Sequence, residues 1–247
     1  MKSLLSILSG LLLFFGCNTQ SEKAQQVSNF PGPFEKGLDA HGGLDLWDTM
    51  GTLSFTELNG SDTIIYTVDL KSRDELIEKK EQYKVGFTAD SISFHPNRDS
   101  FPGKNPRFTH NLRFYFFALH FVTADPGAFQ EVLQPAELEG KMYNRVKITF
   151  GDGVGVAPKD QYILWYDQVD NLLAYCNYSV TYFNERNAEK YSALKYDNWV
   201  EVEGLKFPTE VISYHWKKDS LGDKKYGKKF TDIAISKARP DTKLFTF

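Results

Sequence analysis

Cysteine is scarce in this chain of 247 residues, which contains only Cys17 and Cys176. If Cys17 carries a lipid, as argued below, Cys176 has no partner within the chain and no internal disulfide can form. Cys176 lies in the strand-like stretch LLAYCNYSVTY, on the face that also carries Ala174 and Tyr178. We interpret it as a buried structural thiol, because a reactive cysteine needs an electropositive and partly exposed setting.

An excess of positive charge and the common catalytic motifs are also absent. The chain has 29 Lys and Arg against 32 Asp and Glu, a formal net charge of -3, which argues against a nucleic-acid partner. Its five histidines have no H-E-x-x-H or C-x-x-C companions, and no serine lies in a G-x-S-x-G motif. We therefore expect no metal, no cofactor and no catalytic residues, and a hydrolase whose site is not visible in the sequence stays an alternative.

One long hydrophobic run is present, at the start of the chain. Lys2, the apolar run 4–15 and a glycine before Cys17 form the layout of a bacterial secretory signal that ends in a lipid-attachment cysteine. The run is shorter than the ~20 residues that a membrane-spanning helix needs. We expect residues 1–16 to be a signal peptide and Cys17 to carry the acyl chains that anchor the mature protein. An ordinary signal peptide would need an A-x-A-like cleavage site, and Ser21–Ala24 offers a poor one.

The anchor is followed by a tether and then by one domain. Residues 17–33 are polar and end in two prolines and a glycine, which predicts a flexible segment. Residues 34–247 contain no further linker, and their length is normal for a single β-rich domain. We expect a cell-envelope protein on the outer membrane, with which Asn18 after the lipidated cysteine is compatible. Whether it faces the periplasm or the outside is left open.

The body of the chain is mainly β in its pattern. Hydrophobic residues make up 41% and aromatic residues 15% of the chain, which is enough to form a hydrophobic core against a sheet. The connections are too short for parallel crossovers, so we expect antiparallel pairing. About eleven strands are predicted, over 52–58, 63–71, 74–82, 91–95, 129–134, 143–150, 161–166, 172–183, 191–201, 205–216 and 225–236.

One glycine-rich segment superficially resembles a phosphate-binding loop. Gly151-Asp152-Gly153-Val154-Gly155 follows a predicted strand. A phosphate-binding loop must lead into a helix N-terminus, whereas Pro158 and another strand follow here. We therefore predict a hairpin loop.

Two helices are expected against this sheet. The first starts at Pro33 and carries Phe34, Leu38 and His41 on one stripe. The second covers 108–122 and has two apolar patches on nearly opposite flanks, separated by a narrow polar strip. One patch consists of Phe108, Leu112, Tyr115, Leu119 and Val122, and the other of Phe114, Phe117, Ala118 and Phe121. Such a helix is either sandwiched in the core or forms a lid over an apolar cavity.

Six lysines gather near the C-terminus. They are Lys217, Lys218, Lys224, Lys225, Lys228 and Lys229. Such a run is usually a solvated hairpin that also protects an edge strand. The alternative is a patch that meets anionic lipid headgroups.

Several motifs together resemble an uncharacterised lipoprotein family of Bacteroidota, over residues 34–236. The motifs are Ala40-His41-Gly42-Gly43-Leu44 with Trp47, Asn111-Leu112 through Phe121-Val122 with Ala124-Asp125-Pro126-Gly127, Thr149-Phe150-Gly151 through Val154-Gly155 with Pro158 and Tyr162, and Asp197-Asn198-Trp199 with Gly204-Leu205-Lys206-Phe207-Pro208. The architecture of that family is similar to the outer-membrane lipoprotein-sorting carriers (LolA/LolB-like), whose half-barrel holds acyl chains under helical lids. The resemblance implies a curved antiparallel half-barrel with two helices packed on or in it. Cys17 makes the chain more similar to the membrane-bound acceptor than to the soluble carrier.

Our first hypothesis is therefore an envelope protein that binds or passes on an apolar ligand, such as lipid or lipoprotein acyl chains. The spacing of rings suggests Phe114, Phe117 and Phe121 on the lid side of the cavity. The candidate contacts from the sheet are Tyr162, Trp165 and Tyr178. The alternative from another class is a non-catalytic interaction module, whose interior would be filled by its own side chains.

Overall fold

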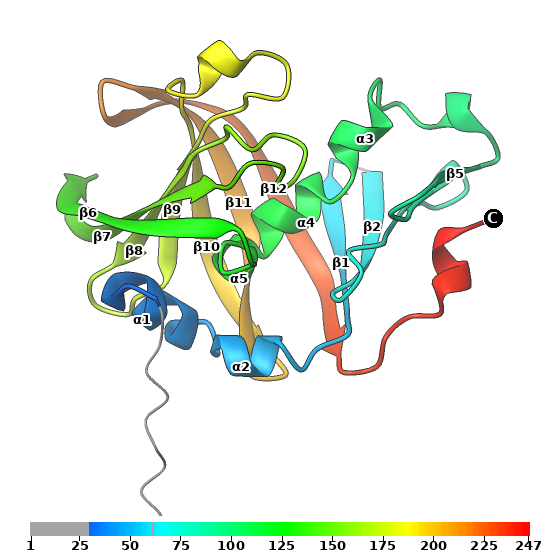
Figure 1. The fold of residues 1–247 in the computed structure, drawn as a ribbon, viewed down its shortest axis with the longest axis horizontal. Coiled ribbons are helices and arrows are strands. Elements are labelled where there is room, and N and C mark those ends of the chain that lie inside the picture. Colours follow the sequence, from blue (N-terminus) through cyan, green and yellow to red (C-terminus); the bar gives the residue numbers. More distant parts are fainter. Residues whose placement is uncertain (1–29, 61) are drawn as a thin grey trace, which may run out of the picture.

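The computed structural model describes residues 30–60 and 62–247 and shows one open antiparallel sheet with short helices across one face (Figure 1). The predicted mainly β class is confirmed. The signal segment, Cys17 and most of the tether lie outside the described residues. The strands are β1 (Thr52–Asn59), β2 (Asp62–Asp69), β3 (Glu75–Lys79), β4 (Tyr83–Phe87), β5 (Ile92–His95), β6 (Ala128–Leu138), β7 (Lys141–Phe150), β8 (Tyr162–Asp167), β9 (Leu173–Tyr178), β10 (Ser192–Val202), β11 (Leu205–Lys217) and β12 (Ser220–Ser236).

The strand order divides the sheet into two meanders. Neighbours run β5-β4-β3-β2-β1-β12-β11-β10-β9-β8-β7-β6, so β1 pairs with β12 at the junction of the two meanders. β5 and β6 are consecutive in sequence but lie at opposite edges of the sheet. The chain between them, residues 96–127, therefore has to cross the full width of the sheet.

The structure has twelve strands where the sequence predicted about eleven. The missed strand is β4, which pairs with β3 through a turn at residues 80–82, where Glu81 has a φ of 61°. The prediction placed this turn inside the strand 74–82. Gly86 in β4 lies against the backbone of Phe245, where a side chain would collide with the carbonyl group. A glycine inside a short strand weakens the strand signal in the sequence.

The crossing segment is not the single helix that was expected over 108–122. It consists of α3 (Pro106–Thr109), α4 (Leu112–Phe117) and α5 (Leu119–Val122). The first break is at Asn111, which has a φ of 58° and whose backbone N–H donates to Glu75 Oε2 at 2.6 Å. The buried carboxyl group thus takes a donor that would otherwise continue the helix. The second break is at Ala118, whose φ of -105° and ψ of 29° are outside the helical range.

The remaining helices lie at the periphery. α1 (Gly32–Ala40) begins one residue before the predicted start and buries Phe34 and Leu38, as expected. α2 (Leu44–Trp47) follows after Gly42, where a side chain would collide with the carbonyl oxygen of Gly204. The short 3-10 helices are η1 (Arg98–Ser100), η2 (Glu185–Asn187) and η3 (Thr242–Phe245).

Rings fill the space between the crossing segment and the sheet. Phe114, Phe117 and Phe121 have no exposed surface. The ring of Phe117 stacks on that of Phe55 with centroids 4.1 Å apart, and Phe121 stacks on Trp47 at 4.5 Å. The inner patch of 108–122 therefore belongs to the main core of the protein.

This burial makes a stability prediction. Phe117→Ala should lower the free energy of unfolding by about 3–5 kcal/mol, because it leaves a cavity among closely packed rings. Urea denaturation followed by circular dichroism would measure the loss. The matched control is Phe183→Ala, since Phe183 is 68% exposed and its removal should change the free energy by about 0.5 kcal/mol or less. Equal losses in both variants would contradict this description of the core.

Candidate functional site

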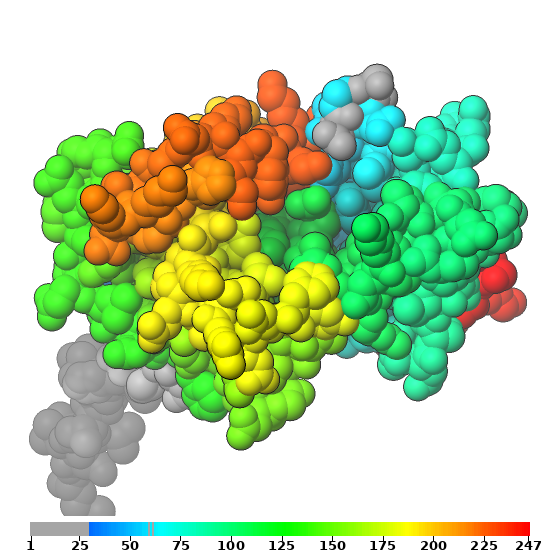
Figure 2. Space-filling model, turned by 90° about the horizontal axis from the view of Figure 1, so that it is seen from above, coloured from blue at the N-terminus to red at the C-terminus, as the bar shows by residue number. Residues whose placement is uncertain are grey.

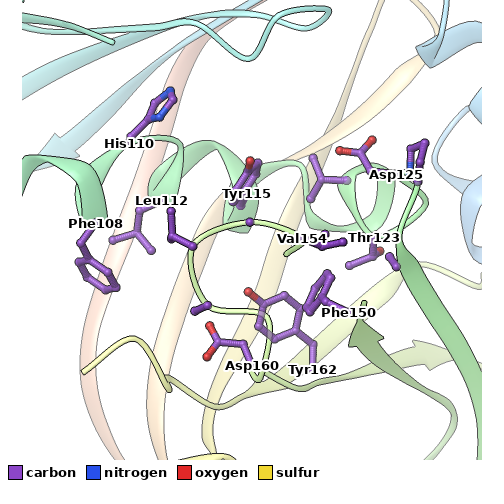
Figure 3. Close-up of a pocket in the computed structure, with 16 residues that line it drawn as sticks. Phe108, His110, Leu112, Tyr115, Thr123, Asp125, Phe150, Val154, Asp160 and Tyr162 are labelled. Atoms are coloured by element: carbon purple, nitrogen blue, oxygen red, sulfur yellow. The ribbon is translucent and has the colours of Figure 1, made fainter. Parts of the chain in front are cut away.

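A pocket of about 160 Å³, here called the lateral pocket, lies beside the crossing segment, on the flank away from the core rings (Figure 3). Its walls are α3 to α5, the start of β6, and the loop between β7 and β8. The lining residues are Phe108, His110, Leu112, Tyr115, Val122, Thr123, Asp125, Pro126, Ala128, Phe150, Val154, Gly155, Val156, Ala157, Asp160 and Tyr162. Most of these side chains are apolar, and the exceptions are His110, Thr123 and the carboxylates of Asp125 and Asp160.

The outer apolar patch of 108–122 forms one wall. Four of its five residues line the pocket, and the fifth, Leu119, is fully buried. In Figure 3 Leu112 and Tyr115 face Phe150 and Tyr162 across the pocket. The two patches that the sequence showed thus have different surroundings: the inner one packs on the sheet and the outer one faces the lateral pocket.

The β7–β8 loop forms the opposite wall. β7 and β8 pair as antiparallel neighbours, which confirms the predicted hairpin loop at 151–155. The loop is held in place where Gly151 N donates to Gly127 O at 2.9 Å. Val154 packs over Gly127, where a Cβ would come within 2.6 Å of its methyl group. The loop therefore covers the pocket through contacts with the turn that precedes β6.

Polar contacts at the pocket go to the surrounding structure. Arg73 binds both oxygens of Asp125 at 2.6–2.8 Å, and its carbonyl lies 2.9 Å from His110 Nε2. Asp160 Oδ1 accepts hydrogen bonds from the backbone N–H and the hydroxyl of Thr181, at 2.6 and 2.7 Å. Burial raises the pKa of both aspartates and lowers that of His110. His110 is therefore uncharged at neutral pH.

These polar groups do not pair a nucleophile with a base. Among the described residues that line the pocket, Thr123 is the only serine or threonine. Its hydroxyl donates to the Leu119 carbonyl at 2.7 Å. Cys176 is buried in the core, as expected, and burial raises the pKa of its thiol. The contacts of the lateral pocket thus give the hydrolase alternative no support.

The six candidate ligand contacts from the sequence do not converge on one cavity. Tyr162 lines the lateral pocket, whereas Phe114 and Phe121 line neither this pocket nor the second one described below. Phe117 and Tyr178 line a second, much smaller pocket. Whether any of these side chains touches a ligand stays a prediction.

Trp165 lies on the other face of the sheet from Tyr162. It packs in a separate cluster with Leu138, Tyr143 and Tyr175, and its indole N–H donates to Asn177 Oδ1 at 2.6 Å. Side chains alternate along a strand, so residues three apart point to opposite faces. Trp165 and Tyr162 therefore lie on opposite faces of the sheet, and Trp165 as a ligand contact stays a prediction.

The cavity expected between the second helix and the sheet is too small for a lipid chain. The second pocket, between α4 and β9 to β12, has a volume of about 30 Å³. A water molecule needs about 10–15 Å³ by this measure, so the space holds about two or three waters. The protein's own rings occupy the rest of the predicted hollow.

Sequence reasoning missed the residues of the β7–β8 loop. Val154, Val156 and Ala157 line the lateral pocket, and Val156 is 56% exposed. The sequence did contain a signal for this site, because apolar side chains in a glycine-rich loop are not expected to be buried in the core. Such exposed apolar residues often mark a binding site.

Comparisons with known proteins show likeness in structure and none in sequence. No protein-family model and no curated protein matches the chain. Solved structures similar to it include a LolA superfamily protein from Nitrosomonas europaea, with 11% identity, 80% of this chain and 89% of that chain covered, and a TM-score of 0.48. A DUF1329 family protein from Desulfovibrio piger has 10% identity, coverage of 82% and 92%, and a TM-score of 0.47. An outer membrane lipoprotein-sorting protein domain from Vibrio parahaemolyticus has 8% identity, coverage of 85% and 97%, and a TM-score of 0.40.

At these identities and TM-scores the likeness decides neither the family nor the function of the chain. The specific Bacteroidota family stays a prediction. Among residues 30–60 and 62–247, no group of three or more histidine, cysteine or acidic side chains could hold a metal ion. No helix in the same part of the chain combines the length and apolar character needed to cross a membrane.

A buried carboxyl group holds the crossing segment at the edge of the lateral pocket. Glu75 has no exposed surface, and it binds the backbone at Asn111, between His110 and Leu112 of the pocket wall. Burial raises its pKa from the ordinary value of 4.5 to about 8, although the Asn111 N–H and Arg113 act in the opposite direction. The folded protein therefore keeps this proton at neutral pH while the unfolded chain loses it.

The raised pKa predicts how stability depends on pH. The contribution of Glu75 is fully present below about pH 4.5 and is lost as pH rises toward 8, at about 1.4 kcal/mol per pH unit. Glu75→Gln cannot ionise, so its free energy of unfolding relative to the unchanged protein should rise over this range. Urea midpoints at several pH values would measure this difference. The exposed Glu137→Gln should show a constant difference, and a constant difference for Glu75→Gln would refute the assignment.

Proposed function

We propose that this protein is anchored to the cell envelope through a lipid on Cys17 and binds the apolar part of a small molecule or lipid in the lateral pocket. The observation that carries the proposal is a pocket of about 160 Å³ with mainly apolar walls. Pockets of this kind bind ligands through buried apolar area and use a few polar groups for orientation. Each Å² of apolar surface that a ligand buries there contributes about 25 cal/mol.

The volume limits how much of a ligand is enclosed. A cavity of about 150 Å³ is known to take up benzene, so the lateral pocket accommodates about six carbon atoms. A longer acyl chain would therefore extend out of the pocket. Phe183, which is 68% exposed, lies beside the pocket with its ring centroid 4.9 Å from that of Phe108. Exposed apolar side chains at this rim would cover further methylene groups.

The charges of the pocket indicate which end of a ligand enters. Its ionisable lining groups in the described structure include Asp125 and Asp160 but no lysine or arginine. A carboxylate or phosphate inside the pocket would face these aspartates without a cation among the lining side chains. An amphiphile would therefore insert its apolar end and leave its headgroup outside.

A second candidate function is the non-catalytic interaction module. The filled space under the crossing segment favours it, since that interior holds no room for cargo. Its partner would contact exposed side chains, among which Phe129, Val132 and Met142 stand out on the β6–β7 edge. Absence of any apolar ligand in the binding experiment below would favour this candidate.

The anchor has its own test. The unchanged chain should incorporate labelled palmitate in a bacterial host and sediment with membranes, because several acyl chains anchor stably. Cys17→Ala should lose both properties. Cys176→Ala should keep them, since that thiol is buried in the folded domain. Labelling that persists in Cys17→Ala would exclude this lipid attachment site.

The lateral pocket predicts a chain-length series. Binding of linear alcohols to the Cys17→Ala chain, measured by displacement of a neutral fluorescent naphthylamine, should strengthen about fourfold per methylene, the equivalent of about 0.8 kcal/mol. The gain should level off beyond about six carbons, where the chain leaves the pocket. Lipid that co-purifies with this variant, identified by mass spectrometry, would show the natural ligand.

A matched pair of variants locates the binding site. Ala157→Trp places a ring in the lateral pocket and should weaken binding about tenfold or more, equivalent to two lost methylene contacts. Val169→Trp adds the same ring at a position that is 86% exposed and outside the pocket, and should leave binding unchanged. Failure of every alcohol to bind, or equal loss in both variants, would refute the proposed function.

A further inference from the structure

Two cations share one buried carboxylate on the opposite flank of α4. Glu57 of β1 is 1% exposed. Arg113 Nε of α4 lies 2.5 Å from its Oε2, and Lys228 Nζ of β12 lies 2.5 Å from its Oε1. Among the ion pairs of the described residues, Glu57 is the only acidic partner of either cation. The group therefore carries one positive charge in excess.

The excess charge is only partly hydrated. The side chains of Arg113 and Lys228 are 27% and 15% exposed. Glu75, which also acts on Arg113, does not neutralise it at neutral pH, because burial raises the pKa of Glu75 to about 8. Removing charges from water is costly unless they are paired. An anion that contacts both cations would complete the pairing that Glu57 provides only in part.

The two cations also line an opening to solvent. Both belong to the pocket of about 30 Å³ between α4 and the sheet, together with Phe116, Tyr178 and Tyr226. Figure 2 looks into a hollow whose floor is formed by green atoms of the α4 region, between the orange strand β12 and the yellow segment near residue 185. We call this pocket and its charged group the cationic opening. It is too small to enclose a chain, but a charged group can reach the cations from outside.

The rim of the cationic opening adds to the positive potential. Lys225 lies on β12 at the rim, where its Nζ approaches Ser192 Oγ at 3.4 Å. Lys224 is exposed on the same strand. Clustered charges of one sign raise the local concentration of an oppositely charged ligand. The lysine run of the sequence is thus adjacent to the buried cations.

We propose that the cationic opening binds a single anionic group, a phosphate or a carboxylate, carried by an amphiphile. The cations Arg113 and Lys228 contact the anionic group, and the neighbouring rings of Phe116 and Tyr178 contact the first carbons attached to it. The site does not depend on the lateral pocket, because no described residue lines both pockets.

The test compares amphiphiles of equal tail and opposite charge. Dodecyl phosphate, dodecyltrimethylammonium and inorganic phosphate are titrated calorimetrically into the full chain with Cys17→Ala, below micelle-forming concentrations. Dodecyl phosphate should bind, and the ammonium compound should not bind at this site. Raising NaCl from about 0.01 M to about 1 M shortens the Debye length from about 30 Å to about 3 Å and should weaken binding about tenfold.

Charge variants at one strand locate the site. Lys228→Gln should weaken dodecyl phosphate binding about tenfold, since it removes a charge-assisted contact. Lys229→Gln makes the same charge change at an exposed position of β12 and should leave the affinity within about twofold. Glu57→Gln should strengthen binding, because it removes the competing negative charge. Circular dichroism checks that each variant is folded. If a variant does not fold, the salt dependence of binding to the Cys17→Ala chain still tests the proposal.

The outcomes separate the possible sources of the anion. If inorganic phosphate binds as tightly as dodecyl phosphate and depends equally on Lys228, the anion site is retained. The proposal that the anion belongs to an amphiphile is then overturned. Equal binding of the two amphiphiles, equal loss in Lys228→Gln and Lys229→Gln, or no binding at all overturns the site itself. Ala157→Trp should bind dodecyl phosphate normally at the cationic opening, so failure of the lateral pocket would be recognised separately.

Discussion

The rest of the structure depends on one topological constraint, the crossing of the sheet by residues 96–127. β5 and β6 follow each other in sequence and lie at opposite edges of a twelve-stranded sheet. The connection must therefore pass over a whole face, where both of its flanks meet protein. This explains why α4 and α5 carry rings on two sides, a pattern that a helix on an ordinary surface does not need. It also creates two separate recesses, one on each side of the crossing.

Buried polar contacts fix the path of this crossing more than helix propensity does. Glu75 binds the backbone at Asn111 and so separates α3 from α4. Glu57 forms an ion pair with Arg113 in the following turn. Farther along, the Tyr196 hydroxyl donates to the carbonyl of Phe116 at 3.0 Å. Each of these partners comes from a strand of the sheet. Contacts with the sheet thus determine where the short helices lie, and these contacts interrupt the hydrogen bonding of the helices themselves.

Local patterns in the sequence predicted the β class, the hairpin loop and the two apolar patches of 108–122. They placed the patch of Phe114, Phe117 and Phe121 toward a cavity, because both patches are apolar and the sequence does not show what the distant strands place opposite each of them. Trp165 is a different case, since its spacing from Tyr162 already put it on the other face of the sheet. The cationic opening was beyond reach of the sequence, because Glu57, Arg113 and Lys228 come together only through the β1–β12 pairing and the crossing.

Magnitudes decide between the two roles that the sequence left open for 108–122, core helix or lid. Opening it as a lid would expose Phe114, Phe117 and Phe121, which are now fully buried. Exposing one such side chain costs about 1.5–3 kcal/mol, so three cost roughly 5–9 kcal/mol. That is comparable to the whole stability of a typical domain, about 5–15 kcal/mol. The crossing segment is therefore part of the core, and the two proposed sites, the lateral pocket and the cationic opening, can be reached without unpacking those rings.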